Sequence, residues 1–246
     1  MWLDPLFASA TLQDLAAMTL TFAVSLTWLR VMDGLAHRGL IEARLSRKII
    51  HIGTGPLFVL CWNLYSREPS ARFWAAAVPL AITLQFVAVG LGWMKDDAAV
   101  KAMTRHGNPR EILLGPLFYG LIFVACTLVF WRMSPVGITS LMILCGGDGL
   151  ADIVGRRWGR AKLPYSREKS WVGSAAMWLG GFTFALAFVA AFNAMGVLEP
   201  KLDINGAILK LGLISLAAAV TESLPLADVD NLTTTGVAIA LGGILF

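Results

Sequence analysis

Two carboxylates enter an apolar stretch of the chain in the segment CGGDGLADIVGRR, residues 145–157. Asp148, Asp152 and Arg156 follow one another at intervals of four residues, so on a continuous helix they share one face. An acid that faces lipid is costly, whereas Mg²⁺ prefers oxygen ligands and commonly takes one or two from carboxylates. We predict that Asp148 and Asp152 bind Mg²⁺ and act in catalysis. The alternative is that Asp152 only forms an ion pair with Arg156 or Arg157.

A basic segment follows directly, between this apolar stretch and the next one. Its cations, together with small residues at the start of the next apolar run, could bind phosphate groups through charge, hydroxyl groups and the N–H groups of a helix terminus. Lys169 is also a candidate catalytic residue. The alternative role for this segment is a positively charged membrane anchor. The predicted phosphate-binding residues here are Arg156, Lys162, Lys169, Ser170 and Gly173, with Arg167 as a further cation.

A second polar cluster lies in TESLPLADVDNLTTT, residues 221–235, which contains no Lys or Arg. It holds Glu222, Asp228, Asp230 and Asn231. An acidic loop within an otherwise basic set of loops is unusual, and we predict that it completes the same site. Glu222 and Asp230 are then further metal ligands, and Asn231 is a nucleotide contact. A solvated turn is the alternative.

A third polar element is RKIIHIGTG, residues 47–55, where Arg47 and His51 are four residues apart and project to similar sides of a helix. His51 is a candidate general base, although a single His near the end of a span is more often a hydrogen-bonded structural residue. The segment HGNPREILLGPLFYG, residues 106–120, adds Arg110 and Glu111.

The composition indicates which elements position these residues. Hydrophobic residues make up 57% of the 246-residue chain and charged residues only 15%, so the chain is predicted to be an all-α, polytopic bundle of transmembrane helices. The first residues lack the basic region of a signal peptide, and Met1 is expected to begin the mature protein. We expect one domain over residues 1–246, with seven or eight spans near residues 12–36, 49–65, 73–94, 112–131, 136–154, 172–192, 204–221 and 232–246.

The basic residues predict the orientation of the bundle. Fourteen of the 20 Lys and Arg residues fall in three alternate connections, near residues 38–48, 95–110 and 156–169. By the positive-inside rule this face is cytoplasmic, and it carries all the candidate site residues. The basic charge therefore reflects membrane topology, and no nucleic-acid partner is expected.

Several of these motifs, in this order, resemble those of the polyprenol kinase family, which includes phytol, farnesol and dolichol kinases and is related to CDP-diacylglycerol synthases. The most specific parts are GDGLADIVGRRWGRAKLPYSREKSWVGS and ESLPLADVDNLT, with RKIIH and REILLGPLFYG in support. The resemblance covers roughly residues 44–235 and is nearest to phytol kinase.

The resemblance implies transfer of the γ-phosphoryl group of CTP to the hydroxyl of an isoprenoid alcohol, with phytol favoured and membrane lipids as surroundings. Phosphoryl transfer needs mainly positioning and neutralisation of phosphate charge, which fits the acids and cations above. No Walker A motif or protein-kinase signature is found in the sequence. A CDP-diacylglycerol synthase-like cytidylyltransferase is the alternative, although its late signature is replaced here by DVDNLTTT. A small-solute transporter is less favoured, because the polar residues stop on one side.

Overall fold

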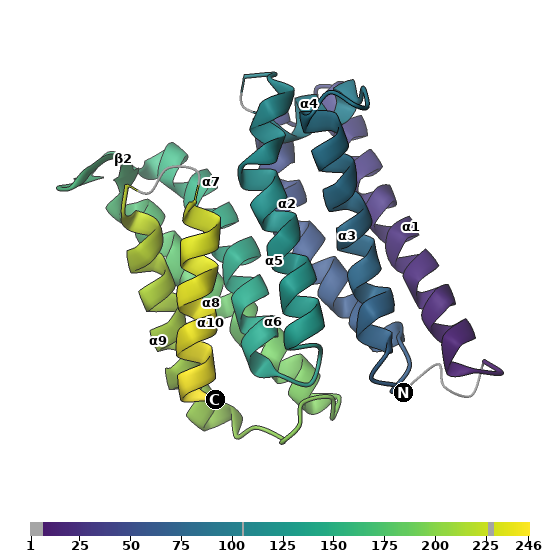
Figure 1. Cartoon of the computed structure of the whole chain (residues 1–246). Coiled ribbons are helices and arrows are strands. Elements are labelled where there is room, and N and C mark those ends of the chain that lie inside the picture. The colour runs from purple at the N-terminus through teal and green to yellow at the C-terminus, as the bar shows by residue number, and fades with distance from the viewer. Residues whose placement is uncertain (1–6, 105, 226–228) are drawn as a thin grey trace. The chain divides into compact units, whose positions relative to one another are not determined.

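The computed structural model describes residues 7–104, 106–225 and 229–246. It consists of two compact units, Met1–Val129 and Phe130–Phe246. Each unit is built almost wholly of helices, which confirms the predicted all-α class (Figure 1). That the whole chain acts as one kinase domain stays a prediction.

The first unit contains four long helices, and two short helices lie in the connection between the third and the fourth. Ser9 caps the first long helix by accepting a hydrogen bond from the N–H of Leu12. Helix α1 packs on α2 and α3, and α3 packs on α5. The elements are α1 (Ala10–His37), α2 (Ala43–Cys61), η2 (Trp62–Leu64), α3 (Ala71–Gly90), α4 (Asp97–Met103), η3 (Pro109–Leu113) and α5 (Gly115–Val129).

The second unit contains the two clearest polar motifs of the sequence. It begins with a continuous helix, α6 (Pro135–Met142), η4 (Ile143–Asp148) and α7 (Gly149–Trp158), in which η4 is a π-helical segment. A hairpin of β1 (Lys162–Leu163) and β2 (Ser166–Ser170) follows. Helices α8 (Trp171–Ala194), α9 (Ile204–Ser223) and α10 (Asp230–Leu245) complete the unit, and α8 and α10 both pack on α9 and on α6 (Figure 1).

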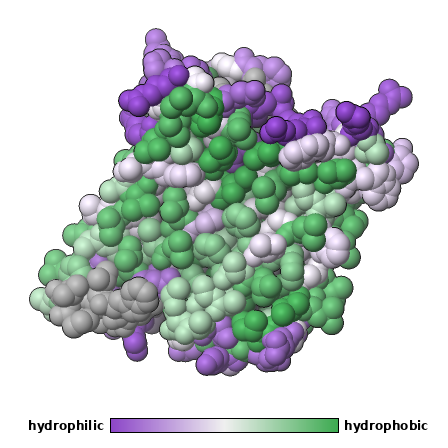
Figure 2. All heavy atoms as spheres, turned by 180° about the vertical axis from the view of Figure 1, so that it is seen from behind, coloured by the Kyte–Doolittle hydropathy of each residue, from purple (hydrophilic) through white to green (hydrophobic). Residues whose placement is uncertain are grey.

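Six helical stretches of the described chain are long and apolar enough to cross a membrane. They match six of the eight predicted spans. The other two predictions fall on α2, which carries several charges in its first turns, and on α10, which has only 16 residues. The predicted count is therefore approximate. Large apolar side chains such as Leu84, Leu209 and Val220 are exposed on these helices, and hydrophobic residues cover most of the face in Figure 2, as expected of a surface in lipid.

The sequence did not predict the hairpin, since residues 156–169 read as an irregular basic loop. The strands pair antiparallel, with an irregularity between Lys162 and Leu163. Leu163, Ser166 and Ser170 are buried, whereas Lys162 and Arg167 are exposed. The hairpin therefore lies with one side against the helices and presents the other to its surroundings.

Candidate functional site

The continuous helix Pro135–Trp158 positions the two acids of the first motif. Its π-helical segment ends at Asp148, and π segments inside α-helices occur frequently at functional sites. From Asp148 onward the helix is regular, so the predicted common face of Asp148, Asp152 and Arg156 is present. Arg156 Nε donates to Asp152 Oδ1 at 2.5 Å. The ion pair that we considered as the alternative role of Asp152 is therefore formed, and its role as a metal ligand stays a prediction.

Lys169 connects the hairpin to the end of α9. Its ammonium group pairs with the carboxylate of Glu222, and the two side chains are 27% and 7% exposed. Burial lowers the pKa of Lys169, but the charge and hydrogen bond of Glu222, followed by the charges of Asp230 and Asp148, raise it by more. The net result is a pKa above the ordinary value of 10.5.

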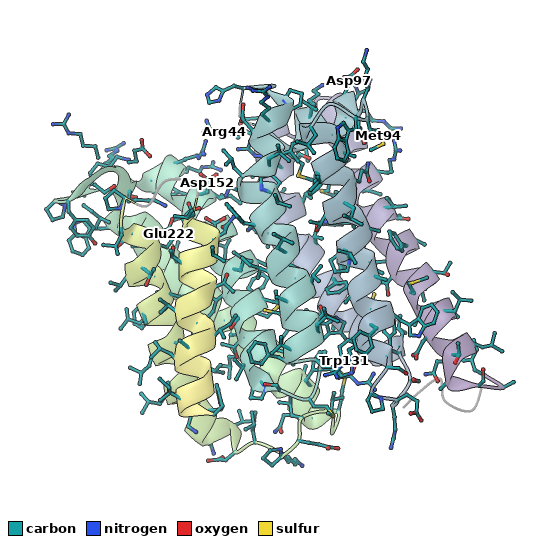
Figure 3. The ribbon with its side chains drawn as sticks, viewed as in Figure 1. Arg44, Met94, Asp97, Trp131, Asp152 and Glu222 are labelled. Atoms are coloured by element: carbon teal, nitrogen blue, oxygen red, sulfur yellow. The ribbon has the colours of Figure 1, made fainter. Side chains whose placement is uncertain are left out.

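Three predicted metal ligands thus act electrostatically on one ammonium group. Asp148 comes from the end of η4, Glu222 from the end of α9 and Asp230 from the start of α10. Figure 3 shows Glu222 and Asp152 at the same end of the second unit, away from Trp131. The structure therefore brings the first and second polar motifs together, as the sequence predicted.

The chemistry of these donors fits a hard divalent cation, because they are carboxylates gathered around a positive charge. Across residues 7–104, 106–225 and 229–246, however, no three acidic, His or Cys side chains are close enough to hold a metal ion as they stand. The positive charge among them is that of Lys169. Mg²⁺ commonly takes only one or two carboxylates and completes its coordination with water and substrate phosphates.

Other basic side chains of the second unit belong to α7 and the hairpin. Lys162 Nζ donates to the backbone oxygen of Glu168, 3.2 Å away across the hairpin. Arg157 stacks its guanidinium on the ring of Trp158, with 5.3 Å between Cζ and the ring centroid. Lys162 is exposed and so remains accessible for the predicted phosphate contact.

Ser170 and Gly173 have a structural role in this conformation. Ser170 Oγ accepts from the N–H of Gly173 at 3.2 Å and caps α8. Gly155 and Gly173 let α7 and α8 approach closely, since a Cβ added at Gly155 would lie 3.3 Å from the Cα of Gly173. The glycines of this region therefore serve helix packing, and phosphate binding by Ser170 and Gly173 stays a prediction.

The second motif opens helix α10. Asp230 is its first residue, and Asp230 Oδ1 accepts from the N–H of Asn231 at 3.0 Å. Both side chains are partly exposed, so they remain accessible for the predicted metal and nucleotide contacts. Asp228, also named from the sequence, lies outside the described residues.

His51 belongs to the first unit, on α2. Its ring lies 4.6 Å from that of Tyr119, and the hydroxyl of Tyr119 donates to the backbone oxygen of His51 at 3.1 Å. Arg47 donates to the backbone oxygen of Thr104 at 2.9 Å. The two quoted motifs of this unit, RKIIH and REILLGPLFYG, are thus in contact. The catalytic role of His51 stays a prediction.

Two residues of the second unit, Tyr165 and Ser223, were not predicted as site residues from the sequence. The hydroxyl of Tyr165, at the turn of the hairpin, lies 2.8 Å from the hydroxyl of Ser223, the residue that follows Glu222. Each falls inside a quoted motif, but neither carries a charge or a recognisable spacing. Their partnership across 58 positions has no local sequence signal.

The chain is similar to plant enzymes over nearly its whole length. It is 46% identical to a protein named probable phytol kinase 1, chloroplastic, from Oryza sativa subsp. japonica, over 93% of this chain and 74% of that protein. It is 42% identical to probable phytol kinase, chloroplastic, from Triticum aestivum, over 97% and 80%. It is 38% identical to farnesol kinase, chloroplastic, from Arabidopsis thaliana, over 96% and 76%. No protein-family model and no solved structure matches the chain.

Proposed function

The chain belongs to the polyprenol kinase family, with phytol and farnesol kinases as its relatives, and we propose that it converts phytol to phytyl phosphate with CTP as the donor. It is a phosphotransferase with an alcohol acceptor, acting on an isoprenoid alcohol. The choice of phytol follows the names of several relatives, and the choice of CTP follows the resemblance found in the sequence.

The observation that carries this proposal is the charge cluster at one end of the second unit. Lys169 lies under the influence of Glu222, Asp230 and Asp148, and further cations belong to α7 and the hairpin of the same unit. Phosphoryl transfer requires chiefly that phosphate charge be neutralised and that donor and acceptor be aligned. A cluster that contains both acids and flexible cations can do both.

The acids are the proposed holders of Mg²⁺. Asp148, Asp230 and Glu222 would supply oxygen ligands, with Asp152 as a fourth if it leaves Arg156. When bound, the ion would neutralise charge on the nucleotide phosphates. Arg156, Lys162 and Lys169 would then orient the phosphate oxygens by charge-assisted hydrogen bonds, with Ser170, Gly173 and Asn231 as further contacts.

The acceptor is proposed to come from the lipid phase. A long isoprenoid chain is stabilised among hydrocarbon tails, and its hydroxyl group lies at the headgroup level, where the helix ends of the second unit carry the charged cluster. By the positive-inside rule we place this end on the cytoplasmic side, from which CTP would arrive. His51, on α2 of the first unit, stays a candidate general base.

The test is a reaction of the purified protein in lipid nanodiscs with Mg²⁺, CTP and phytol. The expected products are phytyl phosphate and CDP. UTP and ATP, and geranylgeraniol, farnesol and a dolichol, are compared in the same assay to establish the donor and the acceptor. Release of pyrophosphate with phosphatidate, and no phosphorylated alcohol, would replace the proposal by a cytidylyltransferase.

Asp148→Asn is expected to abolish turnover while the protein stays inserted. Asp203→Asn is the matched control, because Asp203 caps the opposite end of α9 from Glu222 and Asn caps a helix equally well. The control variant is expected to keep its activity. Equal activity of both variants would remove Asp148 from the proposed site.

A further inference from the structure

The hairpin β1–β2 is too small to hold its own position. Its strands have two and five residues, with an irregular register, and an isolated two-stranded hairpin is at best marginally stable. Leu163 and Ser166 are buried on one side. The position of Lys169, near the end of β2, therefore depends on what fastens this hairpin to the helices.

Two side chains of the hairpin contact consecutive residues at the end of α9. Lys169 pairs with Glu222, and Tyr165 shares a hydrogen bond with Ser223. Glu222 and Ser223 are both buried, at 6% and 2% exposure. The last turn of α9 is thus a fixed surface on which the hairpin is held at two points.

The direction of the Tyr165–Ser223 bond follows from the second contact of Ser223. Ser223 Oγ donates to the backbone oxygen of Val220 at 2.6 Å. A hydroxyl group has one proton to donate, so Ser223 accepts from the O–H of Tyr165. Removal of the Tyr165 hydroxyl alone therefore breaks this contact and leaves the bond from Ser223 to Val220 intact.

We propose that Tyr165 is a positioning residue, whose hydrogen bond to Ser223 holds the hairpin on α9 and so keeps Lys169 among Glu222, Asp148 and Asp230. A lysine side chain has many rotamers, and its confinement to one ion pair costs conformational entropy. The hydrogen bond of Tyr165, four residues earlier on the same hairpin, already restricts the backbone near Lys169. It therefore reduces the conformational entropy that is lost when Lys169 pairs with Glu222. The importance of Lys169 for phosphoryl transfer rests on the proposed function, whereas its positioning by Tyr165 does not.

The test measures the reactivity of Lys169 without nucleotide or alcohol. The protein in nanodiscs receives a short pulse of acetic anhydride, and mass spectrometry gives the acetylation rate of each lysine. Lys169 is expected to react slowly, because its side chain is half-buried and paired with Glu222. Lys162 on the same hairpin and Lys201 are exposed and serve as internal references.

Tyr165→Phe and Ser223→Ala are each expected to raise the ratio of the Lys169 rate to the Lys201 rate roughly two- to tenfold, the range that one hydrogen bond supports. The double variant is expected to match Ser223→Ala alone, and Ser223→Thr, which keeps the hydroxyl, to match the wild type. Loss of fold would also raise this ratio, because Lys201 is already exposed, so each variant is first shown to keep the wild-type melting temperature.

Unchanged ratios in both single variants, or effects that add in the double variant, would overturn the inference. A protein that shows no kinase activity with any alcohol would contradict the proposed function and leave the labelling result as it stands. In turnover, Tyr165→Phe is expected to raise the KM for the nucleotide more than it lowers kcat. Tyr65→Phe, which removes a hydroxyl group bonded to Thr21 in the first unit, is the matched control for loss of a tyrosine hydroxyl.

Discussion

Lys169 of the hairpin and Glu222 of α9 form a largely buried ion pair between residues 53 positions apart. Two further carboxylates, Asp148 and Asp230, act on the same ammonium group. The arrangement joins the two polar motifs of the second unit through one pair of charges. Mutation of Lys169 and Glu222, singly and together, can therefore separate the effect of this ion pair on stability from its effect on catalysis.

Reversal of the pair separates its structural role from its catalytic role. The double variant Lys169→Glu with Glu222→Lys retains opposite charges at the two positions, whereas each single variant leaves like charges together. We expect the single variants to be strongly destabilised, by about 3 kcal/mol or more, and the double variant to recover much of that stability. Thermal unfolding in detergent measures it.

Turnover of the reversed pair is expected to stay at least about 100-fold below the wild type, because the phosphate-facing cation and the metal-facing acid are exchanged. The control is Glu199→Gln, which changes an exposed acid before α9. Full activity of the reversed pair would mean that the two residues only hold the hairpin.

The raised pKa of Lys169 predicts how stability depends on pH. A basic group with a raised folded-state pKa stabilises the protein fully below its unfolded-state pKa, and this contribution is lost as the pH rises through the folded-state pKa. The difference in melting temperature between wild type and Lys169→Met is thus expected to stay constant from pH 7 to about pH 9.5 and to fall above about pH 10.5. A difference that disappears near neutral pH would contradict the burial of this pair.

The pair of Asp152 and Arg156 predicts a different outcome, because it is exposed. The Arg156 side chain is 39% exposed, and such pairs within a helix contribute about 0.5 kcal/mol or less. Arg156→Gln is therefore expected to leave the melting temperature nearly unchanged but to raise the KM for CTP roughly tenfold. Arg157→Gln is the matched control, since Arg157 stacks on Trp158, and an equal effect of both variants would indicate only a general loss of positive charge.

His51 can be tested as a base through its neutral replacement by Gln. If it accepts the alcohol proton, His51→Gln lowers kcat by about 100-fold or more and changes the KM for CTP little. Tyr119→Phe removes the hydroxyl that donates to the backbone of His51 and serves as the structural comparison. Activity of His51→Gln within twofold of the wild type would assign His51 to packing against Tyr119.

The parts of the site that follow from local periodicity could be predicted from the sequence. The common face of Asp148 and Arg156 results from the helical repeat. The apolar runs predict transmembrane helices, because a helix needs about 20 apolar residues to cross a bilayer. The association of Glu222 with the basic segment was inferred from an acidic loop without cations, and Lys169 is now seen to be its partner. The hairpin was missed because its strands are too short for a period-two pattern.

Other features of the site depend on contacts between residues far apart in the chain, which the spacing of residues in the sequence does not predict. The hydrogen bond of Tyr165 to Ser223 joins two neutral residues far apart in the chain, and the capping of α8 by Ser170 uses a residue that equally suits a phosphate contact. The role of His51 involves the first unit, while the acids belong to the second. Its assignment therefore needs experiment.

The π-helical segment Ile143–Asp148 also affects which deletions the helix can accept without changing the direction of Asp148. Its hydrogen bonds run from residue i to residue i+5, so its wide turn contains one residue more than an α-helical turn. Deletion of one residue within 143–147 could close that turn as α-helix and leave the direction of Asp148 nearly unchanged. The same deletion between Asp148 and Arg156 would turn the two side chains apart by about 100°. Natural deletions of one residue in this helix should therefore be tolerated within residues 143–147 and excluded between Asp148 and Arg156.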